Sequence, residues 1–297
     1  MSGRVPVVRL RILAAIARLL PGPLRRRVPS IAGRLSRVAV RSTRRELLAS
    51  HQRRLAPEAS NGEIETRVRA MVGSYARYWL DTLRLPSLSE EECVGSISVE
   101  GYHHVEEALG AGRGAILALP HLGGWEWAGR WLAARDVEVV SVVERLEPPE
   151  VLEWFTSLRA DLGIVVHAAG PDTVARLRET LDRNGVVCLL SDRDVTGGGY
   201  EVEFCGETTR LPAGPAVLAL RSGAPLLPTA VYQVEGDRHL GVVVDPIDTS
   251  RRDGFRRDTE RVMSDLSTAL EDLLRRAPEQ WHLFQPNWPS DPGWVAC

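Results

Sequence analysis

The chain has 297 residues, of which 44% are apolar and 26% are charged. This composition excludes a disordered or fibrous protein, and a chain of this length can bury a large core. All 37 basic residues are arginines, and twelve of them precede Glu46, the first acidic residue. Residues 1–45 therefore carry a formal charge of +12, whereas 25 arginines and 39 acidic residues give the remainder a charge of −14. The net charge of −2 thus combines a basic arm, residues 1–45, with an acidic body, residues 46–297.

The pattern of the arm predicts two amphipathic helices. Apolar residues recur at helical spacing from Val8 to Leu19, and Pro21 ends this first helix. A second helix is expected to begin at Ser30, a suitable N-cap, and to carry another apolar stripe from Ile31 to Val38. Arginines border both stripes, at Arg11, Arg18, Arg34, Arg37 and Arg41 among others.

This combination of apolar stripe and basic border is typical of helices that lie in a membrane interface. No run reaches eighteen apolar residues, so we expect no transmembrane helix, and the arginines between residues 7 and 20 argue against a secretory signal. We therefore expect a cytoplasmic protein whose arm binds an anionic membrane, to which each basic residue can contribute about 1 kcal/mol. Simple packing of the arm on the body remains an alternative. Nucleic acid is not expected as a partner, because no aromatic residues accompany these arginines.

In the body, residues 64–83 have the spacing of a long amphipathic helix that ends near Pro86. From residue 97 onwards, short apolar runs alternate with helical stretches, which predicts an α/β fold with a mostly parallel sheet covered by helices on both faces. The predicted strands are 115–119, 137–143, 164–166, 186–190, 226–232 and 240–244. The predicted helices are 149–162, 173–183, 215–221 and 256–276. Residues 46–297 are expected to form a single domain, with ligands bound beyond the carboxyl ends of the strands.

Familiar catalytic and cofactor motifs are absent. The chain has no P-loop, no Gly-x-Ser-x-Gly elbow, no His-Glu-x-x-His and no Cys-x-x-Cys, and its four cysteines show no metal spacing, so no metal or cofactor is expected. The glycine-rich segment 110–115 loosely fits a dinucleotide pattern. It follows a helix and precedes a strand, however, which is the reverse of the order that phosphate binding requires.

One histidine stands at a place suited to catalysis. The buried-type strand 115–119 runs through Pro120 to His121, and Gly123 and Gly124 then lead into a helix that carries Glu126. Spacing alone is weak evidence, because His167 and Asp172 repeat it, with Asp172 at the expected N-cap of the next helix. The position of His121 at a strand end favours a functional role.

Several short segments, in the same order along the chain, resemble the lipid A late acyltransferase superfamily, and within it the actinobacterial phosphatidylinositol mannoside acyltransferases. The resemblance covers about residues 70–290. Besides His121 and Glu126, the segments that carry it are 74–79, 142–145, 159–163, 192–194, 204–206 and 279–286.

The resemblance implies transfer of a long acyl chain from acyl-CoA to a sugar hydroxyl of a glycolipid, without a metal, by a peripheral enzyme at the cytoplasmic face of the plasma membrane. It implies that His121 and Asp192 are the catalytic pair and that Arg159 lies in the site. Glu126, one turn into its helix, is expected to bind acceptor hydroxyls or else to brace the loop, and it occupies a position where the mannoside enzymes usually carry aspartate. We also expect Glu144, Arg145 and Asp194 to lie near the substrates, since they follow predicted strands.

The residue types suit this chemistry. A sugar hydroxyl attacks a thioester only as its proton is removed, and a neutral histidine is well matched to that task near pH 7. A carboxylate on the other ring nitrogen would hold the tautomer, and Asp192 can do so if its strand neighbours that of His121. The alternatives are an acyltransferase of glycerol phosphate or another polar alcohol, and a catalytically silent lipid-binding scaffold. A hydrolase is disfavoured because no serine or cysteine lies in a recognisable nucleophile turn.

Overall fold

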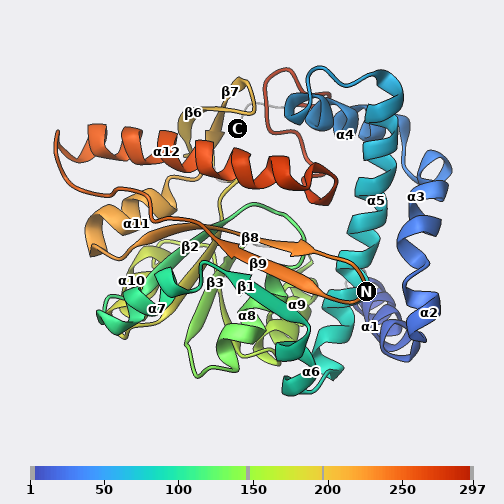
Figure 1. Cartoon of the computed structure of the whole chain (residues 1–297), viewed down its shortest axis with the longest axis horizontal. Helices are drawn as coiled ribbons and strands as arrows, with labels where there is room; N and C mark the ends of the chain where they lie inside the picture. The colour runs from blue at the N-terminus through green and yellow to red at the C-terminus, as the bar shows by residue number, and fades with distance from the viewer. Residues whose placement is uncertain (1–3, 145–147, 196, 295–297) are drawn as a thin grey trace.

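The structure, a computed structural model, describes residues 4–144, 148–195 and 197–294, with side chains from residue 7 onwards (Figure 1). Seven strands form one sheet in the order β1-β9-β8-β2-β5-β3-β4. Every neighbouring pair is parallel except β8 and β9. The strands of this sheet are β1 (Ile97–Glu100), β2 (Ala115–Leu119), β3 (Val139–Val143), β4 (Ile164–Ala168), β5 (Val186–Leu190), β8 (Leu226–Gln233) and β9 (His239–Val243).

The six predicted strands are confirmed, but three others have no counterpart in the predictions. β1 has four residues, of which only Ile97 is buried, so it lacks an apolar run. β6 (Tyr200–Phe204) and β7 (Glu207–Leu211) pair with each other as a separate antiparallel hairpin. Both hairpin strands alternate buried and exposed residues, a weaker signal than the continuous apolar runs of the central strands.

Helices cover both faces of the central sheet, as predicted (Figure 1). One face packs against α10 (Thr173–Asp182), α11 (Gly214–Ser222) and α12 (Phe255–Arg276). The other packs against α6 (Glu90–Gly95), α7 (His103–Gly110), α8 (Trp125–Ala133) and α9 (Pro149–Ala160). The continuous apolar composition of the central strands follows from this double coverage.

The long helix α5 (Asn61–Arg84) stands beside the sheet and separates it from α3 (Val28–Ala39) (Figure 1). It begins with a capping box, in which Ser60 and Glu63 each bind the backbone N–H of the other. The 3-10 turn η1 (Leu85–Ser87) follows α5, and α4 (Ser42–Leu55) precedes it. The predicted boundary between arm and body, at residue 45, lies inside α4.

The arm forms α1 (Arg4–Leu19), α2 (Gly22–Arg25) and α3 (Val28–Ala39). The prediction that Ser30 caps the second helix is wrong, because α3 begins at Val28, one residue before Pro29, whose fixed φ suits the first turn of a helix. None of the described helices combines the length and the apolar character that crossing a bilayer requires.

Small residues fasten the arm to the body. A Cβ added to Gly33 of α3 would lie 2.8 Å from the Arg69 carbonyl oxygen, and one added to Gly73 of α5 would lie 2.6 Å from that of Pro29. In α1 the residues that face the body are Ala14 and Ala17. Because the close-packed faces consist of small residues, the large aliphatic side chains of the arm point outwards.

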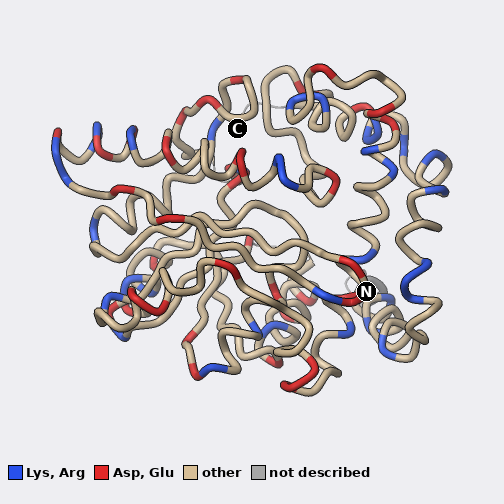
Figure 2. Tube along the Cα trace, in the orientation of Figure 1, with Lys and Arg blue, Asp and Glu red and all other residues tan. Residues whose placement is uncertain are grey.

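The outward face of the arm is apolar. Leu19 and Val38 expose 82% and 90% of their surface, and the other members of this face are at least half exposed. The apolar arm face comprises Val8, Ile12, Leu13, Ile16, Leu19, Leu24, Ile31, Leu35 and Val38. The three helices that carry this face, α1, α2 and α3, contain basic residues and no acidic ones (Figure 2).

Candidate active site

The sheet topology brings His121 and Asp192 together. β2 and β5 are parallel neighbours with Leu119 opposite Leu190, so the two residues leave the same edge of the sheet side by side. His121 Nδ1 lies 2.6 Å from Asp192 Oδ1, and the backbone N–H of His121 donates to Asp192 Oδ2 at 2.9 Å. The expected adjacency of the two strands is therefore confirmed. Their carboxyl ends form the edge at which ligands bind in such sheets.

Asp192 is fully buried and held by several donors. Besides the two groups of His121, the indole Nε1–H of Trp281 donates to its Oδ2 at 2.7 Å. Burial would raise the pKa of the Asp192 carboxyl, but the charge of His121 and these hydrogen bonds lower it below its ordinary value. Asp192 therefore stays ionised beside His121.

His121 retains access to a cleft, since 35% of its side chain is exposed. Burial would lower the pKa of His121, but the charge and hydrogen bond of Asp192 raise it above the ordinary value of 6.5. Among the other charged groups, Arg193 lowers this pKa and Glu144 raises it. With Nδ1–H donated to Asp192, the neutral ring presents its lone pair at Nε2, the arrangement of a general base.

The cleft beside His121 has a volume of about 250 Å³ and is largely aromatic and aliphatic. Its walls come from α5, from α9, from the ends of β3 and β5, and from the segment that contains His282 and Gln285. The aromatic residues that line it are Tyr75, Tyr78, Trp79, Trp125 and Phe155. A cleft with apolar walls and a few polar groups suits a ligand that combines an acyl chain with a polar reacting end.

Glu126 binds two side chains that line the cleft, and its hydrogen bonds do not involve His121. Its Oε1 accepts from the Tyr78 hydroxyl at 2.9 Å and from Arg159 Nη2 at 3.0 Å. Tyr78 remains the donor, because burial and then the charge of Glu126 raise the pKa of its phenol well above 10.0. Arg159 also lies over the ring of Trp125, 4.8 Å from its centroid. Tyr78 and Arg159 line the cleft, so Glu126 orients two side chains that face it.

The remaining predicted site residues do not all line the cleft. Glu144 lines the cleft with an exposed carboxylate, 3.7 Å from Arg193. Asp194 lines a neighbouring cavity and accepts the backbone N–H of Gly199 at 2.6 Å, which stabilises a turn. Arg145, also predicted for this site, lies outside the described residues.

The C-terminal segment contributes two side chains to the site for which the sequence predicts no catalytic or binding role. Trp281 binds Asp192, and His282 lines the cleft. Burial, and then the positive charge of His121, lower the pKa of His282 to about 3, so this ring stays neutral. Segment 279–286 carries part of the family resemblance, but its place beside Asp192 depends on contacts between distant parts of the chain.

The predicted arginines of the arm differ in their surroundings. Arg37 forms an ion pair with Glu65 of α5, which also binds Arg45 and Arg69. Within the described residues, no ion pair engages Arg11, Arg18, Arg34 or Arg41. Arg11 and Arg18 line a groove between α1 and α9, the helix whose other side contributes Phe155 and Arg159 to the cleft. The arm thus packs against the walls of the cleft.

Comparison with known proteins agrees with this geometry. Residues 9–290 match the family described as bacterial lipid A biosynthesis acyltransferase. The chain belongs to this acyltransferase family. Its relatives include the phosphatidylinositol mannoside acyltransferase of Mycolicibacterium smegmatis, 34% identical over 98% of this chain and 96% of the relative. The protein of the same name from Mycobacterium tuberculosis strain H37Rv is 38% identical over 75% of this chain and 70% of the relative. The chain is therefore an acyltransferase.

Proposed function

We propose that this acyltransferase moves a long-chain acyl group from acyl-CoA to a sugar hydroxyl of a membrane glycolipid, a mannose of a phosphatidylinositol mannoside. The observation that carries the proposal is the His121–Asp192 pair at the edge of an aromatic cleft. The names of the relatives support the acceptor.

In the proposed reaction both substrates occupy the cleft together. His121 Nε2 takes the proton of the sugar hydroxyl as its oxygen attacks the thioester carbonyl carbon. The carbon–sulfur bond then breaks, and the thiolate of CoA leaves and receives that proton from the imidazolium. Asp192 stabilises the imidazolium in between. The cleft supports a mechanism without an acyl-enzyme, because no serine, threonine or cysteine is among the described residues that line it.

The arm supports a peripheral location at the cytoplasmic face of the plasma membrane. The apolar arm face would enter the interface while the unpaired arginines meet anionic headgroups. The helices α5 and α9 contact the arm and also line the cleft. Docking of the arm on a membrane would therefore bring the cleft close to a lipid acceptor.

A transfer assay tests the proposal. Purified protein, radiolabelled acyl-CoA and phosphatidylinositol mannoside in anionic vesicles should give a labelled glycolipid and one free thiol per acyl group transferred. Equal or faster transfer to glycerol 3-phosphate would favour the polar-alcohol alternative instead. Thiol release that does not increase when an acceptor is added would indicate hydrolysis of acyl-CoA, and the absence of any thiol release would favour the silent scaffold.

A further inference from the structure

The segment 281–291 holds the proposed catalytic acid from two directions. The indole of Trp281 donates to the Asp192 carboxylate at 2.7 Å, and the amide Nδ2 of Asn287 donates to the Asp192 backbone oxygen at 3.0 Å. Trp281 is 0% exposed and Asn287 is 2% exposed. The position of the Asp192 side chain thus depends on where this segment lies.

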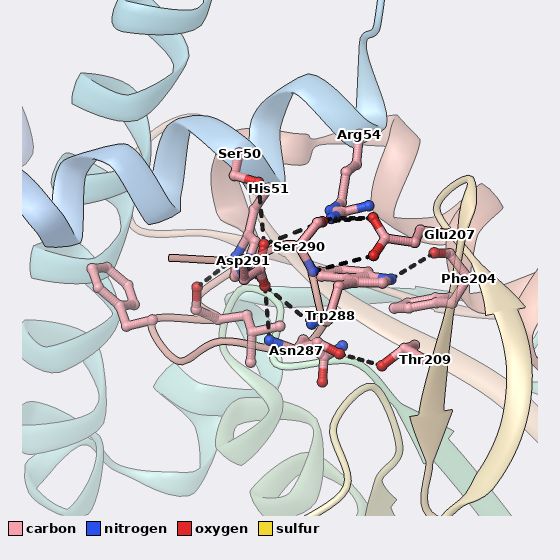
Figure 3. A network of polar contacts seen from close by, with 12 residues as sticks. Ser50, His51, Arg54, Phe204, Glu207, Thr209, Asn287, Trp288, Ser290 and Asp291 are labelled. Atoms are coloured by element: carbon pink, nitrogen blue, oxygen red, sulfur yellow. Dashed lines mark hydrogen bonds and ion pairs between the residues drawn. The ribbon is translucent and has the colours of Figure 1, made fainter. Parts of the chain in front are cut away.

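A buried histidine–aspartate pair fixes the segment (Figure 3). His51, on α4, places Nε2 2.9 Å from Asp291 Oδ2 and Nδ1 3.2 Å from the Leu283 carbonyl oxygen. Neither side chain of the pair is exposed to solvent. Ser50, the preceding residue of α4, donates its hydroxyl to the other carboxylate oxygen at 3.1 Å.

The pair contacts both groups that hold Asp192. The ring of His51 lies against that of Trp281, with centroids 5.5 Å apart. The same Asp291 oxygen that faces His51 accepts the backbone N–H of Asn287 at 2.8 Å. His51 therefore supports the indole donor, and Asp291 fixes the main chain that carries the amide donor.

A buried polar pair is weak evidence for stability, because desolvation offsets much of the attraction between its members, whereas small displacements of a catalytic group are costly. We infer that His51 and Asp291 are positioning residues for acyl transfer, which hold Trp281 and Asn287 so that the Asp192 carboxylate stays aligned with His121. This inference rests on the proposed role of Asp192. Through His51 and Trp281, the helix α4, which begins within the arm, is connected to Asp192 in the active site.

Kinetics of the full chain test the inference. His51→Gln and Asp291→Asn should each lower kcat about 10-fold to 100-fold, as is typical for residues that orient a catalytic ligand, with KM for both substrates unchanged. The acidic midpoint of the kcat/KM profile should move to lower pH, because a loosened Asp192 raises the pKa of His121 less. Glu207→Gln is the matched control. It breaks the Arg54–Glu207 pair of the same network but touches neither Trp281 nor Asn287, and should leave kcat and the midpoint unchanged.

A spectroscopic readout separates this inference from the proposed reaction. The proton between His121 Nδ1 and Asp192 Oδ1 should give a low-field ¹H NMR signal, identified by its absence in His121→Ala. In His51→Gln this signal should broaden or exchange faster, whatever acceptor the enzyme uses. Should the His51 and Asp291 variants fail to fold, Trp281→Phe keeps the ring contact and removes the donor, and should produce the same change. An unaltered signal and unaltered kcat in the folded variants would overturn the inference.

Discussion

His121 is the side chain on which the proposed chemistry depends. His121→Ala should lower the transfer rate by about 10²-fold to 10⁴-fold, the typical contribution of a general base. Steady-state transfer assays check this, together with a thermal melt that shows the variant to be folded. His167→Ala is the matched control, because His167 is the other histidine followed by an acid five positions later and is not part of the cleft. Near-full activity of His121→Ala would refute the assignment.

The pKa of His121 predicts the pH dependence of the reaction. Since Asp192 raises this pKa, His121 becomes a neutral base only above a pH higher than 6.5, and kcat/KM should rise through a midpoint above that value. Asp192→Asn should lower both the rate and this midpoint, because the neutral amide no longer favours the imidazolium. Initial rates between pH 5 and 9 measure the effect. The same midpoint in Asp192→Asn and in the parent protein would show that another acid holds His121.

Gly123, in the turn after His121, shows why the turn needs a residue without a side chain. Its φ is +60°, and a Cβ there would overlap the Val231 carbonyl oxygen. Gly123→Ala should therefore destabilise the protein by well over the roughly 1 kcal/mol that a positive φ costs a non-glycine residue. Gly112→Ala is the control, since its φ of +67° carries the same cost in open space. Equal unfolding free energies for the two variants would contradict this account.

Among the helices, the arm shows how side-chain size decides which face packs. Gly33 and Gly73 allow α3 and α5 to approach closely, so the aliphatic residues remain on the outer side. The two sequence interpretations of the arm, packing on the body and binding a membrane, are therefore compatible, because they use different faces. Exposed aliphatic side chains that recur on the outer side of the arm helices are typical of a docking surface.

Replacing part of the apolar arm face tests its role. The triple substitution Ile12→Gln, Ile16→Gln and Leu19→Gln should weaken sedimentation with anionic vesicles at least tenfold, because each aliphatic side chain contributes about 1 kcal/mol or more when it leaves water. Val165→Gln with Val174→Gln is the control, as these residues are exposed aliphatics of the body. Equal binding by both variants would exclude the face as the docking surface.

Over the whole molecule, the separation of charge suggests an orientation at the membrane. A basic arm would be attracted to an anionic leaflet, while the acidic body would be repelled from it. Arg11 and Arg18 lie beside α9, so the attractive surface adjoins the wall of the cleft. The acceptor could then reach His121 without leaving the bilayer completely.

Salt and charge should act together on this attraction. The quadruple substitution Arg11→Gln, Arg18→Gln, Arg34→Gln and Arg41→Gln should lower binding to anionic vesicles tenfold or more at low ionic strength, and the difference should shrink as salt is added. Neutral vesicles provide the control, because binding to them should change little. A loss of binding that is the same on neutral and anionic vesicles would show that headgroup charge is not involved.

Much of this protein could be predicted from local patterns. The buried strands have continuous apolar runs, and α5 has both its spacing and its capping box, so these elements follow from the sequence. The strand end before His121 and the two glycines after it also point to this residue as the candidate base. The structure begins α3 at Val28, two residues before the predicted Ser30. Pro29 in the first turn is a better signal of the helix start than the serine that follows it.

The sequence alone determined the α/β class, the segregation of charge and the histidine proposed as the base, since each depends on residue type and short-range spacing. Only the tertiary structure decided which groups surround that base. β2 and β5 are separated by about seventy residues, yet their pairing sets His121 against Asp192. The contacts of Trp281 with Asp192, and of His51 with Trp281 and Asp291, join two more distant segments, 281–291 and α4. Such contacts depend on which surfaces meet when the whole core packs, and local sequence patterns do not predict which surfaces these are.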